Sequence, residues 1–374
     1  MMAPTSQTAE TCRVAMFVAP EEPLELRDVP LPSPMSGGAL VRIDCCTLCG
    51  SDLHTITGHR KEPAPSVLGH EAVGTVVELG TPALSDIAGQ PLLPGDRITW
   101  SPVVSCGTCP RCRAGMLQKC LSLFKYGHAL ADGPGTLSGG LAEFIHLRPG
   151  TAAVQLPPEV PDEVFSPASC ATATIAAAFR AAGSVAGRRV LILGAGMLGL
   201  TATAFAKSNE ASQVVISDLN RERLARAEEF GADATVLWQN ERESFRQQLR
   251  ETSGGDLFDV LLDVSGAPDA IEAACQLGDV GASIVLVGSV SPTRPVPIDP
   301  ESIVRRLLTI RGVHNYAPQD LHTAVEFLTR SHSRFPFIQL VEQTFPLERV
   351  NEAVELALRS RPVRLAVRPG KENR

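Results

Sequence analysis

Cysteines are the most chemically suggestive residues of this sequence, because seven of the ten fall into two short clusters. One cluster has the spacing C-x2-C-x2-C-x7-C in the segment CGTCPRCRAGMLQKC, and its members are Cys106, Cys109, Cys112 and Cys120. Four thiolates on one short loop suit a closed tetrahedral zinc site, where the metal supplies folding energy to a lobe without a core. An iron–sulfur cluster uses similar spacing and is the alternative. We predict a structural zinc ion here.

The other cluster lies in the segment CCTLCGSDLH, where a hydroxyl, a carboxylate and an imidazole follow the thiols. Cys45 and Cys46 fit the commonest role of an unpaired cysteine, that of a small buried apolar residue. Cys49, together with His70 of the segment LGHE and the more distant Cys170, would supply three ligands and leave a fourth position open, as catalytic zinc requires. A lone histidine is more often a satisfied polar residue than a ligand. The prediction therefore depends on these three side chains meeting.

A glycine-rich turn indicates a dinucleotide site. After the apolar strand RRVLIL comes the pattern G-x-G-x-x-G, formed by Gly194, Ala195, Gly196, Met197, Leu198 and Gly199. Glycines allow a tight turn and let backbone N–H groups approach a pyrophosphate at the N-terminus of the following helix. Asp218 ends the next strand, VVISD, where its carboxylate would bind the adenosine ribose and repel a 2′-phosphate. We therefore predict NAD rather than NADP, although Arg223 could still admit some NADP.

The elements that must position these residues differ between the two parts of the chain. Residues 14–160 contain short β-branched stretches separated by Gly and Pro, typical of a distorted β-barrel with long loops. From residue 167 onward, near-continuous apolar strands alternate with helical stretches, which indicates a parallel sheet covered on both faces. The tail returns to helices and a last strand. We predict an α/β fold with two domains: 1–165 joined by 313–374, and 166–312.

Composition and charge exclude several classes of protein. The 374 residues include 34 basic and 41 acidic side chains, a net charge of −7, so there is no basic patch for nucleic acid and no polybasic membrane anchor. No apolar run reaches the ~20 residues that span a bilayer. The N-terminal segment MMAPTSQTAETCR has no apolar signal core, so we expect a cytoplasmic protein. In that compartment cysteines are expected to be metal ligands, catalytic groups or buried thiols rather than disulfides.

Together these motifs resemble the zinc-dependent medium-chain alcohol dehydrogenases. The resemblance rests on the segments CGSDLH and GHE, the four-cysteine loop, Cys170 followed by ATAT, and the glycine-rich turn, and it covers nearly the whole chain. It implies a GroES-like catalytic domain, a Rossmann doubly wound parallel sheet, hydride transfer between an alcohol and NAD, and two zinc ions per chain. Catalytic zinc would lie on Cys49, His70 and Cys170. Asp52 would orient His70 through its other ring nitrogen, and Glu71 would be a close neighbour that can approach the metal.

The same resemblance implies further roles. The alcohol proton would leave through the Ser51 hydroxyl, the nicotinamide ribose and His54. Thr174 would pack beside the nicotinamide ring. Strand ends should also meet the cofactor, and the residues expected there are Asp263, Ser265, Gly288 and the backbone of 312–314, including Val313. A homodimer or homotetramer is expected.

The substrate is the feature that the sequence determines least. The segments FKYGH, SCATAT and GVHNY look like a branch described as phosphonate-catabolism-associated alcohol dehydrogenases, which implies a small hydroxyphosphonate as substrate. The pocket residues expected from this are Lys125, Tyr126, His128, His314 and Asn315. Lys125 either helps to hold an anionic group or is a solvated loop lysine. A polyol and an amino alcohol such as threonine are competing substrates. A zinc-free reductase of the same fold and a non-enzymatic zinc or redox sensor are the alternative classes.

Overall fold

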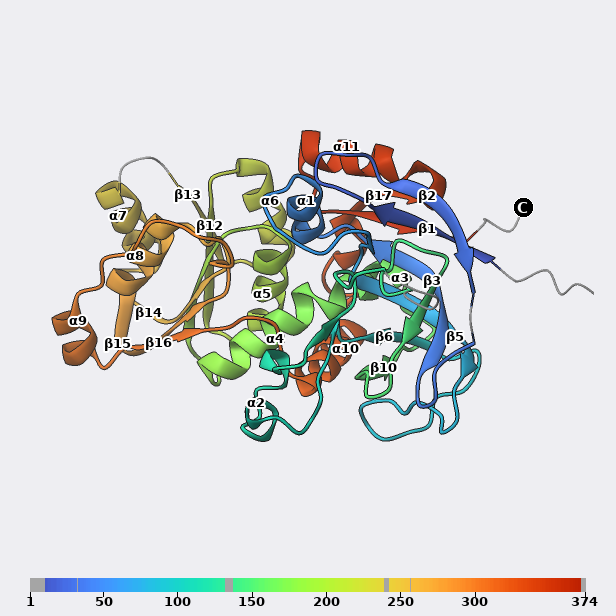
Figure 1. The fold of residues 1–374 in the computed structure, drawn as a ribbon. Coiled ribbons are helices and arrows are strands. Elements are labelled where there is room, and N and C mark those ends of the chain that lie inside the picture. Colours follow the sequence, from blue (N-terminus) through green and yellow to red (C-terminus); the bar gives the residue numbers. More distant parts are fainter. Residues whose placement is uncertain (1–10, 32, 132–136, 239–241, 256, 371–374) are drawn as a thin grey trace, which may run out of the picture. The chain divides into compact units, whose positions relative to one another are not determined.

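The computed structural model describes residues 11–31, 33–131, 137–238, 242–255 and 257–370. The chain forms two compact units (Figure 1): unit 1 comprises Met1–Cys170 and Ile338–Arg374, and unit 2 comprises Ala171–Phe337. The second boundary follows residue 337, whereas the sequence predicted a return to the first domain at 313. The reason is α10 (Pro318–Ser331), which packs against α4 (Ala171–Ala182) and α5 (Met197–Ser208) within unit 2.

Unit 1 is built mainly from antiparallel strands. One sheet has the order β2-β1-β4, a larger one has the order β10-β6-β5-β3-β18-β17 with β9 beside β3, and β7 pairs with β8. The strands are β1 (Thr11–Phe17), β2 (Glu25–Pro30), β3 (Ala39–Thr47), β4 (Ser66–Val67), β5 (Glu71–Leu79), β6 (Arg97–Trp100), β7 (Val103–Val104), β8 (Phe124–Lys125), β9 (Phe144–Leu147), β10 (Ala153–Gln155), β17 (Val341–Pro346) and β18 (Arg364–Arg368). The helices are α1 (Gly50–Ile56), α2 (Pro110–Arg113), α3 (Asp162–Phe165), α11 (Val350–Ser360) and the 3-10 turns η1 (Leu117–Lys119), η2 (Ser166–Ser169) and η4 (Leu347–Arg349).

The core of unit 1 explains why these strands form. Val41 and Ile43 of β3, Val76 of β5 and Val367 of β18 are fully or almost fully buried in one apolar cluster. Cys45 and Cys46 in β3 have no exposed surface, and burial raises the pKa of Cys45 to about 12. Both thiols therefore have the buried environment expected for packing residues.

Unit 2 contains a six-stranded parallel sheet of order β13-β12-β11-β14-β15-β16. Its strands are β11 (Arg189–Leu193), β12 (Gln213–Asp218), β13 (Ala234–Leu237), β14 (Phe258–Asp263), β15 (Gly278–Leu286) and β16 (Thr309–Gly312). Its further helices are α6 (Arg221–Glu229), α7 (Arg242–Thr252), α8 (Pro268–Leu277) and α9 (Pro300–Arg306), with η3 (Phe337–Leu340) at the boundary. Leu191, Val215, Leu261 and Ile284 are buried in its core, as expected of strands that are covered on both faces. The predicted fold class is confirmed.

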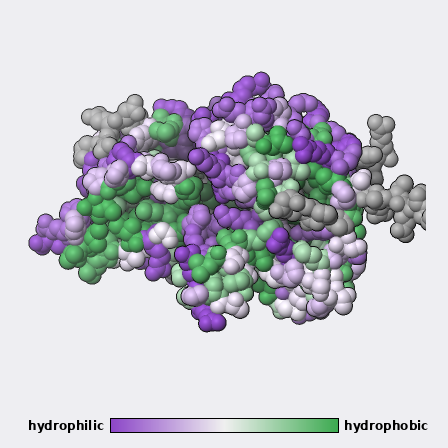
Figure 2. Space-filling model, viewed as in Figure 1, coloured by the Kyte–Doolittle hydropathy of each residue, from purple (hydrophilic) through white to green (hydrophobic). Residues whose placement is uncertain are grey.

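The surface of unit 2 includes an exposed apolar face. Val280, Ile298, Val304 and Leu307 are between 44% and 71% exposed, and Figure 2 shows hydrophobic residues gathered over the part of unit 2 that contains β15 and β16. We call these four residues the apolar face. Among the described residues, no helix combines the length and the apolar character that crossing a membrane requires.

Candidate active site

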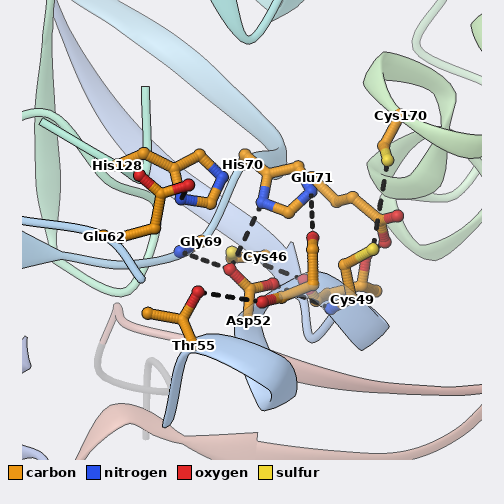
Figure 3. Close-up of polar contacts among 12 residues, drawn as sticks. Cys46, Cys49, Asp52, Thr55, Glu62, Gly69, His70, Glu71, His128 and Cys170 are labelled. Carbon is orange, nitrogen blue, oxygen red and sulfur yellow. Dashed lines mark hydrogen bonds and ion pairs between the residues drawn. The ribbon is translucent and has the colours of Figure 1, made fainter. Parts of the chain in front are cut away.

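Four side chains of unit 1 converge on one point. Cys49 precedes α1, His70 and Glu71 lie at the start of β5, and Cys170 follows η2. Their ligand atoms all lie within 4.8 Å of one another, and the Sγ atoms of Cys49 and Cys170 are 4.0 Å apart (Figure 3). We call these four residues the Cys49 cluster. The structure thus brings together the three predicted zinc ligands and Glu71.

The Cys49 cluster has the donor chemistry and spacing of a zinc site. Zinc binds thiolate, imidazole and carboxylate, and two sulfur ligands at about 2.3 Å in a tetrahedron are about 3.8 Å apart, close to the observed separation. The Cys49 and Cys170 thiols share a hydrogen bond, and this bond, with Arg364 and His70 nearby, holds the pKa of the Cys49 thiol well below its ordinary value. A thiolate is the form that binds metal.

Asp52 fixes the orientation of the His70 ring. Its Oδ1 lies 3.2 Å from His70 Nδ1 and its Oδ2 accepts a hydrogen bond from the backbone N–H of Cys49 at 2.9 Å. Burial alone would lower the pKa of His70, but the fully buried Asp52 carboxylate outweighs it and the net pKa is raised. With Nδ1 turned to Asp52, Nε2 is the nitrogen that faces the cluster.

Ser51 and His54 occupy positions consistent with the predicted proton path, but the path itself is untested. Ser51 Oγ lies 3.3 Å from His70 Nε2. His54 is exposed at the surface of α1, three residues from Ser51, so both side chains lie on one side of the helix. The relay stays a prediction.

Arg364 is a site residue that sequence reasoning missed. Its Nε and Nη2 donate hydrogen bonds of 2.8 Å to Oε2 and Oε1 of Glu71, and Nη2 lies 3.7 Å from Cys49 Sγ. Thr47 Oγ1 donates a further bond of 2.7 Å to Oε2 of Glu71. Burial raises the pKa of Glu71, and Arg364 acts against that rise. Glu71 is thus held by Arg364 and Thr47 at the edge of the cluster.

The four-cysteine loop forms a second cluster of ligand atoms within 4.8 Å of one another. The Sγ atoms of Cys109 and Cys112 are 3.5 Å apart and those of Cys106 and Cys120 are 3.4 Å apart. Backbone N–H groups of Cys106 and Cys109 point at cluster sulfurs at 3.2 and 3.4 Å. Hydrogen bonds from Thr108 and Cys109 lower the pKa of Cys106 to about 6. Four sulfurs at this spacing fit a closed zinc site.

The glycine-rich turn of unit 2 adopts the conformation that the motif requires. Gly194 has φ +112, a region that favours glycine, and a Cβ on Gly199 would lie 1.8 Å from the Gly194 carbonyl oxygen. Gly196 precedes α5, which begins at Met197. Asp218 Oδ2 accepts a hydrogen bond of 2.6 Å from the backbone N–H of Ala195. The glycine-rich turn and Asp218 are therefore adjacent, and their contacts with a cofactor stay predictions.

The other predicted cofactor residues lie mostly at the same edge of the sheet. The strands β12, β11, β14 and β15 are parallel neighbours, so their carboxyl ends share one edge of the sheet. The residues at or just after these ends are Asp218, Gly194, Ser265 and Gly288. Asp263 accepts hydrogen bonds from Ser265 N–H and Oγ at 3.0 and 2.7 Å, a contact that shapes this loop. Leu198 lies at the start of α5, Arg223 on α6 and the partly exposed Thr174 on α4. The backbone N–H of Val313 donates a hydrogen bond to the carbonyl oxygen of Leu286. The contacts of these four residues with a cofactor stay predictions.

Of the predicted pocket residues, Tyr126 requires a correction. Its side chain has no exposed surface, and its hydroxyl is bonded to Thr151 Oγ1 at 2.6 Å and accepts the N–H of Arg148 at 2.7 Å. The hydroxyl therefore fastens the core of unit 1 and does not face a ligand. Lys125 is partly exposed in β8. His314 and Asn315 follow β16 in unit 2, and their role stays a prediction.

His128, by contrast, lies beside the Cys49 cluster. Its ring centroid is 5.2 Å from that of His70, and its Nδ1 is 3.7 Å from Oε1 of Glu62. Burial, aided by the neighbouring His70, lowers the pKa of His128 to about 3. Glu62 was not predicted, because a glutamate in a Pro-rich loop carries no spacing signal.

Comparison with known proteins gives two family matches. Residues 35–158 match a family described as alcohol dehydrogenase GroES-like domain, and residues 198–330 match one described as zinc-binding dehydrogenase. An L-threonine 3-dehydrogenase of Paraburkholderia xenovorans (strain LB400) is 32% identical over 298 residues, which are 78% of this chain and 80% of that protein. The 5-exo-hydroxycamphor dehydrogenase of Pseudomonas putida is 28% identical over 347 residues, 92% of this chain and 95% of that protein.

Solved structures agree with this. An alcohol dehydrogenase of Thermotoga maritima superposes with a TM-score of 0.91 at 28% identity, covering 96% of this chain and 100% of that one. A zinc-binding dehydrogenase of Sinorhizobium meliloti 1021 bound to NADP gives a TM-score of 0.83 at 25% identity over 96% and 100% of the two chains. An alcohol dehydrogenase of E. coli CFT073 complexed with NADH gives 0.80 at 25% identity over 96% and 99%.

Proposed function

Because the chain belongs to the zinc-binding medium-chain alcohol dehydrogenase family, and is an oxidoreductase of that type, we propose that it transfers hydride between a small polar alcohol and NAD. The observation that carries the proposal is the convergence of Cys49, His70 and Cys170 in one cluster, of which only Cys170 is partly exposed. In the proposal these three residues hold catalytic zinc, and the four-cysteine loop holds structural zinc. Family membership favours this reading over a non-enzymatic zinc or redox sensor.

The proposed chemistry divides between the metal and the protein. Zinc, when bound, supplies a Lewis acid that polarises the substrate oxygen and favours loss of its proton. Asp52 keeps His70 in the tautomer that presents Nε2. Ser51 Oγ, which lies beside that nitrogen, would take up the substrate proton while it releases its own, and His54 would pass a proton to solvent.

The cofactor assignment rests on the turn after β11 and on Asp218. A helix N-terminus with free N–H groups binds a pyrophosphate, and a carboxylate at the end of β12 favours a ribose hydroxyl over a 2′-phosphate. Relatives of known structure bind NADH in one case and NADP in another. We propose a preference for NAD, which the ratio of kcat/KM for the two cofactors tests; an NADP preference would contradict it.

Three substrate classes are candidates for the alcohol. The sequence motifs favour a small hydroxyphosphonate. The partly exposed Lys125 would supply a cation for its anionic group. A polyol and an amino alcohol such as threonine are the alternatives, and the curated relatives include threonine dehydrogenases. If hydroxyalkylphosphonates and uncharged alcohols of equal length show equal kcat/KM, unchanged by Lys125→Ala, the phosphonate proposal fails.

The central experiment combines metal content with turnover. The purified protein is expected to contain two zinc ions per chain and to reduce NAD with an alcohol panel, followed by absorbance at 340 nm. Cys49→Ala and His70→Ala are expected to lose one zinc and all turnover. Cys275→Ala, which changes a half-buried thiol of unit 2, is the matched control and should keep both. Retained turnover in either ligand variant would refute the zinc assignment.

Oligomerisation and location are further proposals. The apolar face, whose side chains are up to 71% exposed, supports a homodimer or homotetramer, because monomers rarely expose large contiguous apolar patches. Light scattering of the wild type and of a Val304→Asp, Leu307→Asp variant tests it. A monomeric wild type would contradict the proposal. A cytoplasmic location stays a prediction.

A further inference from the structure

His128 is a buried imidazole with an unused nitrogen. The residue is 8% exposed, yet among the described residues its Nδ1 has no hydrogen-bond partner. Buried polar atoms are almost always paired, so the unpaired Nδ1 points to a contact that completes only when the site is occupied, and the Glu62 carboxylate 3.7 Å away is the group that faces it. Figure 3 shows one ring nitrogen turned to the Glu62 carboxylate and the other on the side of His70.

Glu62 is held in place for this contact by Arg60. The guanidinium of Arg60 approaches Oε1 of Glu62 at 2.7 Å through both Nε and Nη2, and the backbone N–H of Arg60 bonds to His54 O at 2.9 Å. The Glu62 side chain is only 12% exposed. The carboxylate is therefore anchored to the end of α1, the helix that also carries Ser51.

This anchoring determines which nitrogen of His128 can meet a ligand. The 3.7 Å separation between Nδ1 and Oε1 is a few tenths of an ångström beyond a hydrogen bond, and such contacts commonly tighten when substrate binds. A hydrogen on Nδ1 then points at Glu62. In a neutral imidazole this leaves Nε2 as an acceptor, on the side that faces His70.

We infer that Arg60, Glu62 and His128 form a recognition wall in which His128 Nε2 accepts a hydrogen bond from a second donor group of the substrate. The inference rests on the proposed function and selects among its substrates: alcohols that carry a hydroxyl or an ammonium one or two carbons from the reacting carbon. The ring centroids of His70 and His128 are 5.2 Å apart, so one short molecule reaches both. A fully ionised phosphonate offers Nε2 no hydrogen-bond donor, and the Glu62 carboxylate would repel its charge.

The size of the expected discrimination follows from burial. A site built to hydrogen-bond a substrate hydroxyl rejects the analogue that lacks it far more strongly than an apolar pocket rejects a missing methylene, because the buried partner is left unpaired. Here a single neutral hydrogen bond is at stake. We expect about tenfold preference for the donor-bearing substrate, the net effect of one such bond.

The test compares four substrates of similar length: butane-2,3-diol, 3-aminobutan-2-ol, butan-2-ol and a hydroxypropylphosphonate. The wild type is expected to show about tenfold higher kcat/KM for the diol or the amino alcohol than for butan-2-ol. Comparison of the diol with the amino alcohol shows whether the site prefers a hydroxyl or an ammonium group.

Variants of the recognition wall test the same ratio of kcat/KM values. His128→Phe should lower that ratio toward one, and His128→Gln, which keeps an acceptor near the Nε2 position, should restore part of it. Glu62→Gln should lower the ratio mainly through KM, as a positioning residue would. His322→Gln, on the exposed surface of α10, is the control and should leave the ratio unchanged.

The outcomes separate this inference from the proposed function. If the wild type oxidises butan-2-ol or the phosphonate as well as both donor substrates, the recognition wall is wrong while the dehydrogenase assignment stands. If no alcohol reduces NAD, the proposed function fails. In that case 15N spectra of the wild-type histidines still decide: addition of butane-2,3-diol must shift an acceptor-type Nε2 signal that His128→Gln removes. No shift would overturn the inference.

Discussion

The Cys49 cluster and the four-cysteine loop reach similar sulfur spacings by different routes. In the loop, the first and last thiols are 14 residues apart and their sulfurs are separated by 3.4 Å. In the Cys49 cluster, the two thiols are 121 residues apart and their sulfurs are separated by 4.0 Å. The loop can therefore assemble its site from one short segment. The Cys49 cluster exists only when β3, β5 and η2 are folded together.

This difference suggests different roles for the metal at each place. Cys106 and Met116 of the loop are exposed, so a metal there would chiefly contribute folding energy. The Cys49 cluster is built on a core that is already packed, with Asp52 and Glu71 fully buried beside it. A metal there is not needed to hold the strands together. We expect its loss to affect activity much more than stability.

The largest expected effect comes from removing a ligand of the Cys49 cluster. Cys170→Ala should lower kcat/KM by about 1000-fold or more, because the Lewis acid contributes several kcal/mol to the transition state. The variant should keep the zinc of the loop and a near-wild-type melting temperature. Metal analysis and calorimetry check both points. A variant that unfolds would show that this metal is structural as well.

The second effect concerns the ion pair behind the cluster. Arg364→Gln leaves Glu71 buried without its cation, and breaking one side of such a buried pair costs about 3 kcal/mol or more. The Glu71 side chain is 0% and the Arg364 side chain 11% exposed, so solvent screens the pair little. Denaturant unfolding measures the loss. The double variant Arg364→Met, Glu71→Gln should recover part of it, and Arg349→Gln, which breaks an exposed pair, should change nothing measurable. A single Arg364 variant as stable as wild type would contradict the prediction.

A third, smaller effect is expected at the loop. Cys109→Ala should remove one zinc and lower the melting temperature by about 5 °C, while the activity of the molecules that remain folded stays near that of wild type. The measurements are zinc content, thermal unfolding and kcat per folded molecule. Should kcat fall tenfold at a temperature well below the transition, the loop would have a direct part in turnover.

Local signals explain how much the sequence could predict. The four-cysteine spacing, the glycine-rich turn and the change in strand texture are each contained in a short segment, and each was found as predicted. The domain return at 313 was misplaced, because the amphipathic pattern of α10 does not say which core the helix covers. Tyr126 was placed in a pocket, but its hydroxyl finds partners inside the core.

Contacts between distant segments explain the remainder. Arg364 is one of two arginines in the ordinary strand sequence RLAVR, 293 residues from Glu71, so no spacing rule selects it. Glu62 and His128 lie in separate loops, and only the folded unit 1 places one beside the other. Donor chemistry suggested the three zinc ligands, but no spacing rule joins Cys170 to Cys49, 121 residues away. Pairings of this kind require the tertiary structure.

The smallest expected effect concerns Asp52, which touches no substrate. Asp52→Asn should weaken zinc binding at the Cys49 cluster by about tenfold, the lower end of the loss found when the residue that orients a ligating histidine is changed. Competition with a chelator measures the zinc affinity. In the zinc-free protein the Asp52 carboxylate raises the pKa of His70, so this pair stabilises the fold fully below the unfolded value of about 6.5 and loses that contribution as pH rises through the raised pKa. The parent should therefore show an alkaline loss of stability that the variant lacks. Equal pH profiles would mean that Asp52 acts only as the cap of α1, through its bond to the Cys49 N–H.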